Sequence, residues 1–378
     1  MENYEIIARV ERALGIKGIL DKLDRLPPTD LQSLLLALYE RKPAKITAAS
    51  LFEQYERNRF VCPSAVSQNL FASVERVALD LLPDKFNVVE LSPVAPFGVN
   101  SVLTQNSQKK IMSTVRNLEV CADSTTALIL ECAHLRKKLL KNDSKSSQLI
   151  KLATNMRNIR LQNFKDIPGF TSHFKALTLA TAGRDCGSEI VEIQSCLEHL
   201  MFYIDFLNNL HELGFKIGNI NVVFSDIRIT EKIIRNVDGD RKKLGLLSQN
   251  PQFDLFRHFH ILFPAQIQFI EEISDEFVKK YGLAENIFFL SKIEEEVIKV
   301  LVRRSPHVSF SIDLGRIAGI GYYSDLCFKI RAHNNEDQVF PVADGGMNDW
   351  TQKLLQSRKE RALASGMGTE LLCQKFKS

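Results

Sequence analysis

An acidic and a hydroxyl side chain stand two positions apart in the stretch EVCADSTTAL, at Asp123 and Thr125. A carboxylate and a hydroxyl presented side by side are good partners for an ammonium group, because charge-assisted hydrogen bonds are the stronger kind. The stretch is typical of a short strand, a turn and a helix, so Asp123 can instead serve only as the cap of that helix. The sequence leaves both roles open, ligand contact and helix capping.

Two adjacent tyrosines, Tyr322 and Tyr323, follow the turn AGIG and lead into the alternating run SDLCFKI. Glycine lets the backbone come close to a ligand, and a glycine-rich turn that leads into a strand commonly lines a pocket. No charged catalytic residue stands directly beside the pair. We therefore expect the two tyrosines to form the floor of a small-molecule pocket.

Arg160 lies in the strand-like run NIRLQNF, and HFKALTLATAG returns as a second strand after a turn or loop at KDIPG. The planar fork of a guanidinium suits bidentate capture of a carboxylate or a phosphate. An arginine on a strand is also often a plain surface residue. We therefore predict that Arg160 binds an anion.

Composition excludes several classes of protein. The chain has 378 residues with a net charge of only +4, so charge gives no case for nucleic-acid binding. Its seven cysteines are scattered, with no C-x-x-C, which indicates neither a disulfide framework nor a zinc site. No stretch approaches the roughly 20 apolar residues of a membrane helix, and the N-terminus lacks a signal-peptide core. We expect a cytoplasmic protein with reduced thiols.

The hydrophobic periodicity divides the chain into a helical N-terminal segment, residues 1–62, and a mixed core, residues 63–378. TDLQSLLLALYERK predicts a helix capped by Thr29, and EIQSCLEHLMFYIDFLNNLHELG predicts a long amphipathic helix. Residues 230–305 are mostly helical. HVSFSIDLG, YYSDLCFKIRA and QVFPVADGG are typical of successive antiparallel strands, and WTQKLLQSRKERALAS of a final helix. The predicted fold class is α+β with a mainly antiparallel sheet.

Four stretches, in this order, resemble the catalytic core of class II aminoacyl-tRNA synthetases, specifically the histidyl-tRNA synthetase branch. NVVELSPVAP, with Pro93, is similar to motif 1 at the family's dimer interface, and EVCADSTTAL is similar to its amino-group site. NIRLQNFKDIPGFTSHFKAL resembles motif 2. The closing segment resembles the branch's Tyr-Tyr loop, its glycine pair and motif 3. The branch includes the regulatory subunit of ATP phosphoribosyltransferase, which does not charge tRNA.

The resemblance implies roles for particular residues. It places Asp123 and Thr125 on a ligand's amino group, and Arg160 on the α-phosphate of ATP and the substrate carboxylate. It implies a nucleotide site, if that site is retained, built from Arg160, His173, Phe174 (stacked on adenine) and Glu370 of motif 3. The tyrosine pair and the glycine pair, Gly345 and Gly346, complete the predicted ligand site. No catalytic residue is assigned.

Departures from the family pattern limit what can be carried over. Ala318 stands where the branch has an arginine before the tyrosines, Leu371 replaces the terminal arginine of motif 3, and Gln162 replaces a glutamate. Ala176 and Ala180 stand where the synthetase has polar groups for histidine. One stabilising group at a developing charge is commonly worth about 2.7–4 kcal/mol. Loss of two arginines should therefore weaken adenylate formation severely.

The fold implied is a class II synthetase-like antiparallel sheet flanked by helices, with a helical insertion at about 230–305 and no anticodon-binding domain, so ordinary tRNA charging is not expected. The leading hypothesis is a paralogue that binds an amino acid or related small molecule as a regulatory or sensor subunit, a homodimer with a partner enzyme subunit. The alternative is an ATP-dependent ligase using ATP and magnesium on a non-tRNA acceptor. A ligand-free dimeric scaffold is the third hypothesis.

Two further groups of residues have side chains that could bind a metal or act as a nucleophile. His258 and His260 lie two positions apart but have no third ligand at a clear spacing, so no metal site is predicted. Cys186 lies beside Arg184 in a polar turn, which could lower the pKa of its thiol, but no base can be placed near it. Neither group supports an assignment.

Overall fold

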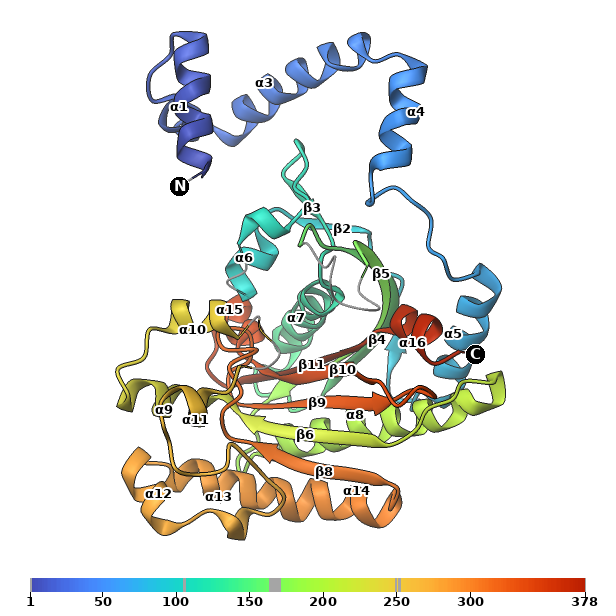
Figure 1. Ribbon diagram of the computed structural model, residues 1–378, viewed down its shortest axis with the longest axis vertical. Coiled ribbons are helices and arrows are strands. Elements are labelled where there is room, and N and C mark those ends of the chain that lie inside the picture. Colours follow the sequence, from blue (N-terminus) through green and yellow to red (C-terminus); the bar gives the residue numbers. More distant parts are fainter. Residues whose placement is uncertain (1, 105–106, 163–170, 249, 251–252, 378) are drawn as a thin grey trace.

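The computed structural model describes residues 2–104, 107–162, 171–248, 250 and 253–377 (Figure 1). The whole of the predicted turn KDIPG lies outside these residues, as does most of the loop between the two strands of the motif 2-like stretch. No helix among the described residues is both long and apolar enough to cross a membrane.

The N-terminal segment is helical, as the sequence predicts, and its helices lie to one side of the core in Figure 1, where Gln32 of this segment accepts a hydrogen bond from Asn117 at 3.1 Å. Its helices are α1 (Glu2–Leu14), α2 (Ile19–Asp24), α3 (Pro28–Arg41) and α4 (Ala48–Arg57). Helix α4 begins with a capping box in which Thr47 and Ser50 bond reciprocally. The predicted cap Thr29 is wrong: the cap position is Pro27, two residues earlier, and helix α3 begins at Pro28 because proline is favoured at the first helical position.

A twisted sheet organises the core, and its antiparallel centre confirms the predicted α+β class. In spatial order its strands are β1 (Asn87–Val88), β4 (Ile150–Ile159), β5 (His173–Arg184), β11 (Glu360–Met367), β10 (Val339–Asn348), β9 (Leu326–His333), β6 (Ile220–Asp226), β8 (Val308–Asp313) and β7 (Gln266–Ile267). Strands β2 (Val94–Pro96) and β3 (Leu118–Val120) form a separate antiparallel pair.

Helices cover both faces of the sheet because its central strands are apolar on both sides. On β5, Leu177 and Leu179 pack into the same core as helix α8 (Ile190–Asn209), whereas Ala180 and Ala182 pack with helix α7 (Ser124–Asn142). This alternation is the period of two that a strand imposes on its side chains. Small residues on the α7 side let that helix, and the turn before it, lie close over the sheet.

The remaining helices surround this framework. They are α5 (Gln68–Leu81), α6 (Val99–Thr104), α9 (Ile227–Asn236), α10 (Arg241–Leu247), α11 (Leu255–His258), α12 (Asp275–Tyr281), α13 (Ala284–Ile293), α14 (Lys299–Arg304), α15 (Trp350–Leu355) and α16 (Thr369–Lys375). Helices α9 to α14 occupy most of the region predicted as a helical insertion. The short strand β7 also lies in that region, at the edge of the sheet.

Two predictions about the late strands are wrong. Strand β8 does not pair with β9; it pairs in parallel with β6, which also lies beside β9. The stretch predicted as one final helix is the short helix α15 followed by strand β11, which lies between β5 and β10. Pairing on both sides and burial of its alanines outweigh the helical propensity of ERALAS.

Candidate ligand-binding site

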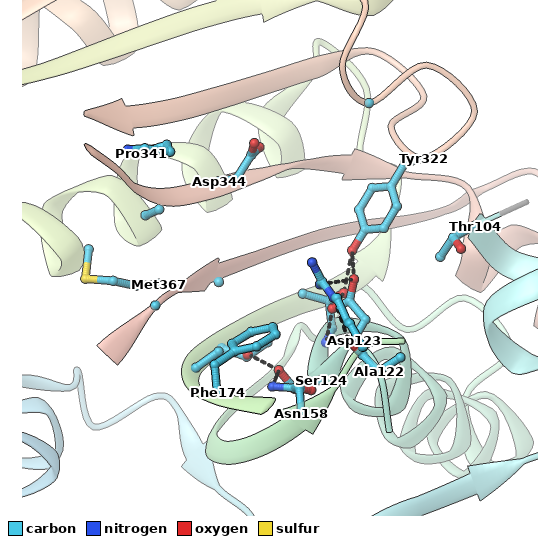
Figure 2. Close-up of a pocket in the computed structure, with 18 of the residues that line it drawn as sticks. Thr104, Ala122, Asp123, Ser124, Asn158, Phe174, Tyr322, Pro341, Asp344 and Met367 are labelled. Carbon is cyan, nitrogen blue, oxygen red and sulfur yellow. Dashed lines mark hydrogen bonds and ion pairs between the residues drawn. The ribbon is translucent and has the colours of Figure 1, made fainter. Parts of the chain in front are cut away.

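A cavity of about 570 Å³ lies over the antiparallel centre of the sheet, beside the beginning of α7 (Figure 2). Asp123, Thr125, Arg160, Phe174, Tyr322 and Tyr323 all contribute to its lining. These residues come from the turn before α7, the ends of β4 and β5, and the loop before β9. The structure thus brings together six of the residues that the sequence singles out.

Asp123 acts as the helix cap and also faces the cavity. It precedes α7, and its Oδ1 accepts hydrogen bonds from the Thr125 amide (3.1 Å) and the Thr125 hydroxyl (2.6 Å). Its other oxygen, Oδ2, accepts one from the Tyr322 hydroxyl at 3.0 Å (Figure 2). The Thr125 and Tyr322 hydroxyl oxygens lie 2.5 Å apart. One carboxylate and two hydroxyls therefore converge on one wall of the cavity.

Tyr322 is held by aromatic contacts on two sides. Its ring meets those of Tyr323 and Trp350 edge-on, with centroids 4.8 and 4.9 Å away. Burial, together with the nearby Asp123 carboxylate, raises the pKa of the Tyr322 hydroxyl well above its usual value. The hydroxyl therefore keeps its proton at neutral pH and donates it toward Asp123.

The turn before the tyrosines depends on Gly319. Its φ of +108° is rarely adopted by other residues, and a Cβ at this position would lie 2.6 Å from a Tyr323 ring carbon. The Gly319 carbonyl accepts hydrogen bonds from the amides of Tyr322 and Tyr323. Close packing of this turn therefore aims both tyrosines at the cavity.

Arg160 forms the adjoining wall. Its Nε donates to the Ala122 carbonyl at 2.8 Å, and its Nη2 lies 3.4 Å from Asp123 Oδ2. Its guanidinium also lies over the ring of Phe174, 5.1 Å from the centroid. Arg160 is thus a half-exposed cation next to the carboxylate, where it could hold an anionic group of a ligand whose amino group contacts Asp123.

A second charged cluster, absent from the predicted site, lines the cavity beyond Tyr323. Arg316 binds both oxygens of Asp344, at 2.8 and 2.9 Å, and Tyr323 donates to Asp344 at 2.8 Å. Lys329 lies 3.8 Å from the same carboxylate. Arg316 is buried, and its Nη1 has no partner among the described residues. Figure 2 shows Asp344 on a strand well apart from the Asp123–Tyr322 cluster.

The charged groups of the lining are unbalanced. Lys110, Arg160, Arg316 and Lys329 contribute four positive charges, whereas Asp123 and Asp344 contribute two negative ones. A cavity with an excess of positive charge favours a ligand that carries an anionic group. Together with the carboxylate and two hydroxyls at Asp123, this balance fits a molecule that has both an amine and one or more acidic groups.

The other predicted site residues lie outside the cavity lining. Gly345 and Gly346 are in strand β10, where a Cβ would lie 2.4 Å from Ser365 Cβ and 2.6 Å from Cys327 Cβ respectively. Glu370 is buried and binds Arg157 Nη1 and the Lys175 amide, both at 2.9 Å. These glycines allow close packing within the sheet, and Glu370 ties α16 to β4 and β5.

His173 also makes internal contacts. Its Nδ1 lies 2.7 Å from Arg157 Nη1, and its Nε2 lies 2.7 Å from the Cys62 carbonyl oxygen. The imidazole therefore links strand β5 to the segment after α4. Of the four residues predicted for nucleotide binding, only Arg160 and Phe174 line the cavity.

The residues that replace family groups are found mostly in the lining. Ala318, Leu371, Ala176 and Gln162 all contribute to the cavity wall, whereas Ala180 is buried in the core beneath α7. Arg316 lines the cavity near Ala318, whereas Arg184 lies outside the lining. Uncharged side chains, apolar except for Gln162, thus occupy positions where the resemblance implies charged or polar groups.

Among the described residues, no group of three or more His, Cys, Asp or Glu side chains could hold a metal ion. His258 ends helix α11, and His260 lies in a turn with φ of +53°, so the pair does not share a strand. All seven cysteines are free, and Cys186 is exposed.

Solved structures with the same arrangement of elements identify the fold. An ATP phosphoribosyltransferase regulatory subunit/histidyl-tRNA synthetase from Bacillus halodurans superposes with a TM-score of 0.59 at 16% identity, covering 84% of this chain and 83% of that chain. The chain has a class II aminoacyl-tRNA synthetase-like fold. Histidyl-tRNA synthetase from a Nostoc species superposes with a TM-score of 0.56 at 12% identity, covering 83% of this chain and 73% of that one.

Sequence comparison gives a weaker similarity to the same branch. A histidine–tRNA ligase from Sulfurisphaera tokodaii is 25% identical over 203 residues, 50% of this chain. The match spans about half the length of that curated relative, 46%. No family model matches the chain. The predicted likeness to the histidyl-tRNA synthetase branch is confirmed by these structures and this relative.

Proposed function

We propose that this protein is a histidyl-tRNA synthetase-like paralogue that binds an amino acid or a closely related small molecule and acts as a regulatory or sensor subunit rather than charging tRNA. The observation that carries the proposal is the convergence of Asp123, Thr125 and Tyr322 on one wall of the cavity. The ligand's ammonium group displaces part of the hydrogen bonding between these three side chains and receives a carboxylate and two hydroxyls in return.

Arg160 holds the ligand's carboxylate beside this ammonium site. Its Nη2 is 3.4 Å from the Asp123 carboxylate, so the two groups are close enough for one α-amino acid to contact both, with its carboxylate on Arg160 and its ammonium group on Asp123. The alanine and leucine side chains of the lining favour a site that binds the ligand without activating its carboxylate. Ala318 and Leu371 lack the charge that would stabilise a phosphate-bearing transition state.

The resemblance also supports proposals about assembly and compartment. We infer a homodimer formed through the region similar to motif 1. Within this region Val88 is exposed, and exposed apolar side chains also occur before and after it in the sequence, at Leu79, Phe97, Val102 and Leu118. A regulatory role further calls for a partner enzyme subunit. The similar structure from Bacillus halodurans is named as a regulatory subunit of an enzyme, ATP phosphoribosyltransferase. Seven free cysteines favour the cytoplasm as the compartment.

A thermal-shift screen tests the proposed function. The purified protein is heated with ATP and magnesium, histidine and each other amino acid, singly and combined. A ligand at 100 times its dissociation constant stabilises by about 2.7 kcal/mol, so an amino acid should raise the melting temperature without ATP. If no amino acid shifts the transition at millimolar concentration, the proposal is wrong.

The positive charge of the cavity favours a second candidate, an ATP-dependent ligase that activates a carboxylate for a non-tRNA acceptor. Arg160 and Phe174 fit an anionic nucleotide, but the set is incomplete because His173 and Glu370 bind other protein groups. A base stacked on the Arg160 face of Phe174 would also have to displace the guanidinium. We therefore derive no reaction step through ATP.

Pyrophosphate exchange separates the two candidates. The proposed sensor incorporates no labelled pyrophosphate into ATP with any amino acid, because the groups that stabilise adenylate formation are missing. Exchange dependent on one amino acid, and lost in Arg160→Ala, would establish the ligase instead.

A further inference from the structure

A second cavity, of about 830 Å³, lies on another part of the core, between α13, α15, the beginnings of α8 and α9, and the segment that follows Tyr323. Its lining residues are Glu189, Glu192, Arg228, Ala284, Glu285, Phe288, Phe289, Ser324, Asp325, Asp349, Gln352 and Arg361. None of these residues lines the first cavity. Ser324 and Asp325 directly follow the two tyrosines, so one short segment contributes to both sites.

The lining is strongly acidic, with five carboxylates and two guanidinium groups. Both guanidinium groups already have acidic partners. Arg228 binds Asp226 at 2.8 Å, and Arg361 binds Asp185 at 2.6 Å and Glu192 at 2.9 Å. Two lysines outside the lining also pair with its carboxylates, Lys292 with Glu189 and Lys353 with Asp349. With all these partners counted, seven carboxylates face four cations, so the cavity still holds an excess of negative charge.

Glu192 is the lining carboxylate that most clearly lacks a partner. The residue is 7% exposed, and its Oε1 accepts a hydrogen bond from Arg361 Nε. Its Oε2 is buried and has no partner among the described residues. A buried charged oxygen without a hydrogen bond is costly, so a donor that reaches Glu192 from the cavity gains both charge attraction and a missing hydrogen bond.

Aromatic rings add a surface that suits organic cations. Phe288 is 65% exposed, and Lys292 Nζ lies over its ring, 5.0 Å from the centroid. The Arg228 guanidinium lies over Phe289 at 5.2 Å. Faces of aromatic rings attract ammonium and guanidinium groups, whereas a hydrated metal ion prefers several oxygen ligands at fixed geometry.

We propose that the second cavity binds a small organic cation with at least two positively charged ammonium or guanidinium groups, one of which bonds to Glu192. The other charge is matched by Asp325 and the more exposed carboxylates of the lining. Acidic lining excludes phosphate-bearing ligands, RNA included, from this cavity. The proposal does not depend on the function proposed for the first cavity.

Calorimetric titration of the full-length protein with butane-1,4-diamine, spermidine and agmatine tests this site, with butane-1,4-diol as the uncharged control. We expect at least one dication to bind and the diol not to bind. Glu192→Gln should weaken binding about tenfold or more, as loss of a hydrogen bond to a charged group implies. Asp80→Asn, the same loss of charge on the exposed face of α5, should leave the affinity unchanged.

Asp123→Asn in the first cavity should also leave cation binding unchanged, which separates this site from the proposed function. If Glu192→Gln does not fold, as judged by its melting transition, Asp349→Asn takes its place at the exposed side of the cavity. Absence of binding by all three cations at millimolar concentration overturns the proposal. Binding that neither Glu192→Gln nor Asp349→Asn weakens also overturns it.

Cation binding should weaken as the pH falls through about 6. Burial raises the pKa of Asp325 to about 6, with Asp226 and Glu192 adding to the rise, while Arg228 and the Leu326 amide oppose it. Below that pH the Asp325 carboxyl is neutral and attracts a cation less. Titrations at pH 7.5 and 5.0 should differ for the parent protein and differ less for Asp325→Asn; equal pH dependence in both would contradict the role of Asp325.

Discussion

An Asp123→Asn variant should bind the protein's amino-acid ligand at least tenfold more weakly than the parent, while its melting temperature without ligand stays close to the parental value. The amide keeps the hydrogen bonds to Thr125 but loses the charge that attracts an ammonium group. Hydrogen bonds to charged groups are worth about 1.5–3 kcal/mol, which corresponds to a loss of roughly ten- to a hundredfold in affinity. Calorimetric titration of both proteins measures the difference.

This substitution also separates the two roles that the sequence leaves open for Asp123. Asparagine and aspartate are nearly equal as helix caps, so a residue that serves only as a cap tolerates the change. Asp143→Asn, at the exposed end of the same helix, is the matched control for the loss of one charge. Equal ligand affinity in the parent and in Asp123→Asn would show that Asp123 serves only as a helix cap.

Glu360→Gln should lower the free energy of unfolding by about 3–5 kcal/mol, the usual cost of breaking a buried ion pair from one side. Arg136 and Glu360 have fully buried side chains and share two hydrogen bonds, of 2.9 and 3.0 Å. Arg136 also donates to the carbonyls of Ser146 and Gln148. The substitution leaves the buried guanidinium without its counter-charge. Urea unfolding of both proteins gives the change.

Two controls define the origin of that loss. Asp80→Asn breaks the exposed pair between Arg76 and Asp80, and it should change the stability by less than about 0.5 kcal/mol. The double variant Arg136→Met/Glu360→Leu removes both buried charges and should recover part of the stability that the single variant loses. A Glu360→Gln protein as stable as the parent would show that the pair contributes little to the fold.

The cavity wall formed by Asp123, Thr125 and Tyr322 was largely predictable from the sequence. A strand, a turn and a helix in EVCADSTTAL place Asp123 and Thr125 at the beginning of α7, where a cap residue must stand. The turn before the tyrosines is equally local, because its backbone conformation needs glycine at positions 319 and 321, where φ is positive. Arg160 was predicted within the strand-like run NIRLQNF, but only Asn158 and Ile159 of that run lie in β4, and Arg160 directly follows the strand.

The Arg316–Asp344 cluster was not predictable in the same way. Asp344 lies opposite Lys329 only because an irregularity between Pro341 and Ala343 shifts the register of β10 against β9. In the register that holds from Val339 to Pro341, Lys329 would pair with a neighbour of Asp344, and the Asp344 side chain would lie on the other face. Pro341 is a sequence signal for such a bulge, but the size of the shift is set by pairing.

Strand β11 is likewise an element of the fold that could not be predicted from the local sequence. Its residues ERALASGM include good helix formers, and the helix α15 just before it makes a continuous helix the natural prediction. Long-range pairing with β5 and β10 makes this segment a central strand instead. Contacts with residues far away in the sequence outweigh local propensity here, as they do at the parallel pairing of β8 with β6.

The most direct test of the account compares one amino acid with its own deaminated analogue. The amino acid that stabilises the protein most is titrated by calorimetry, followed by the carboxylic acid that differs only in lacking the α-amino group. We predict at least tenfold tighter binding of the amino acid, because only its ammonium group can contact Asp123, Thr125 and Tyr322. Equal affinity for both molecules would contradict the ammonium site on which the proposed function rests.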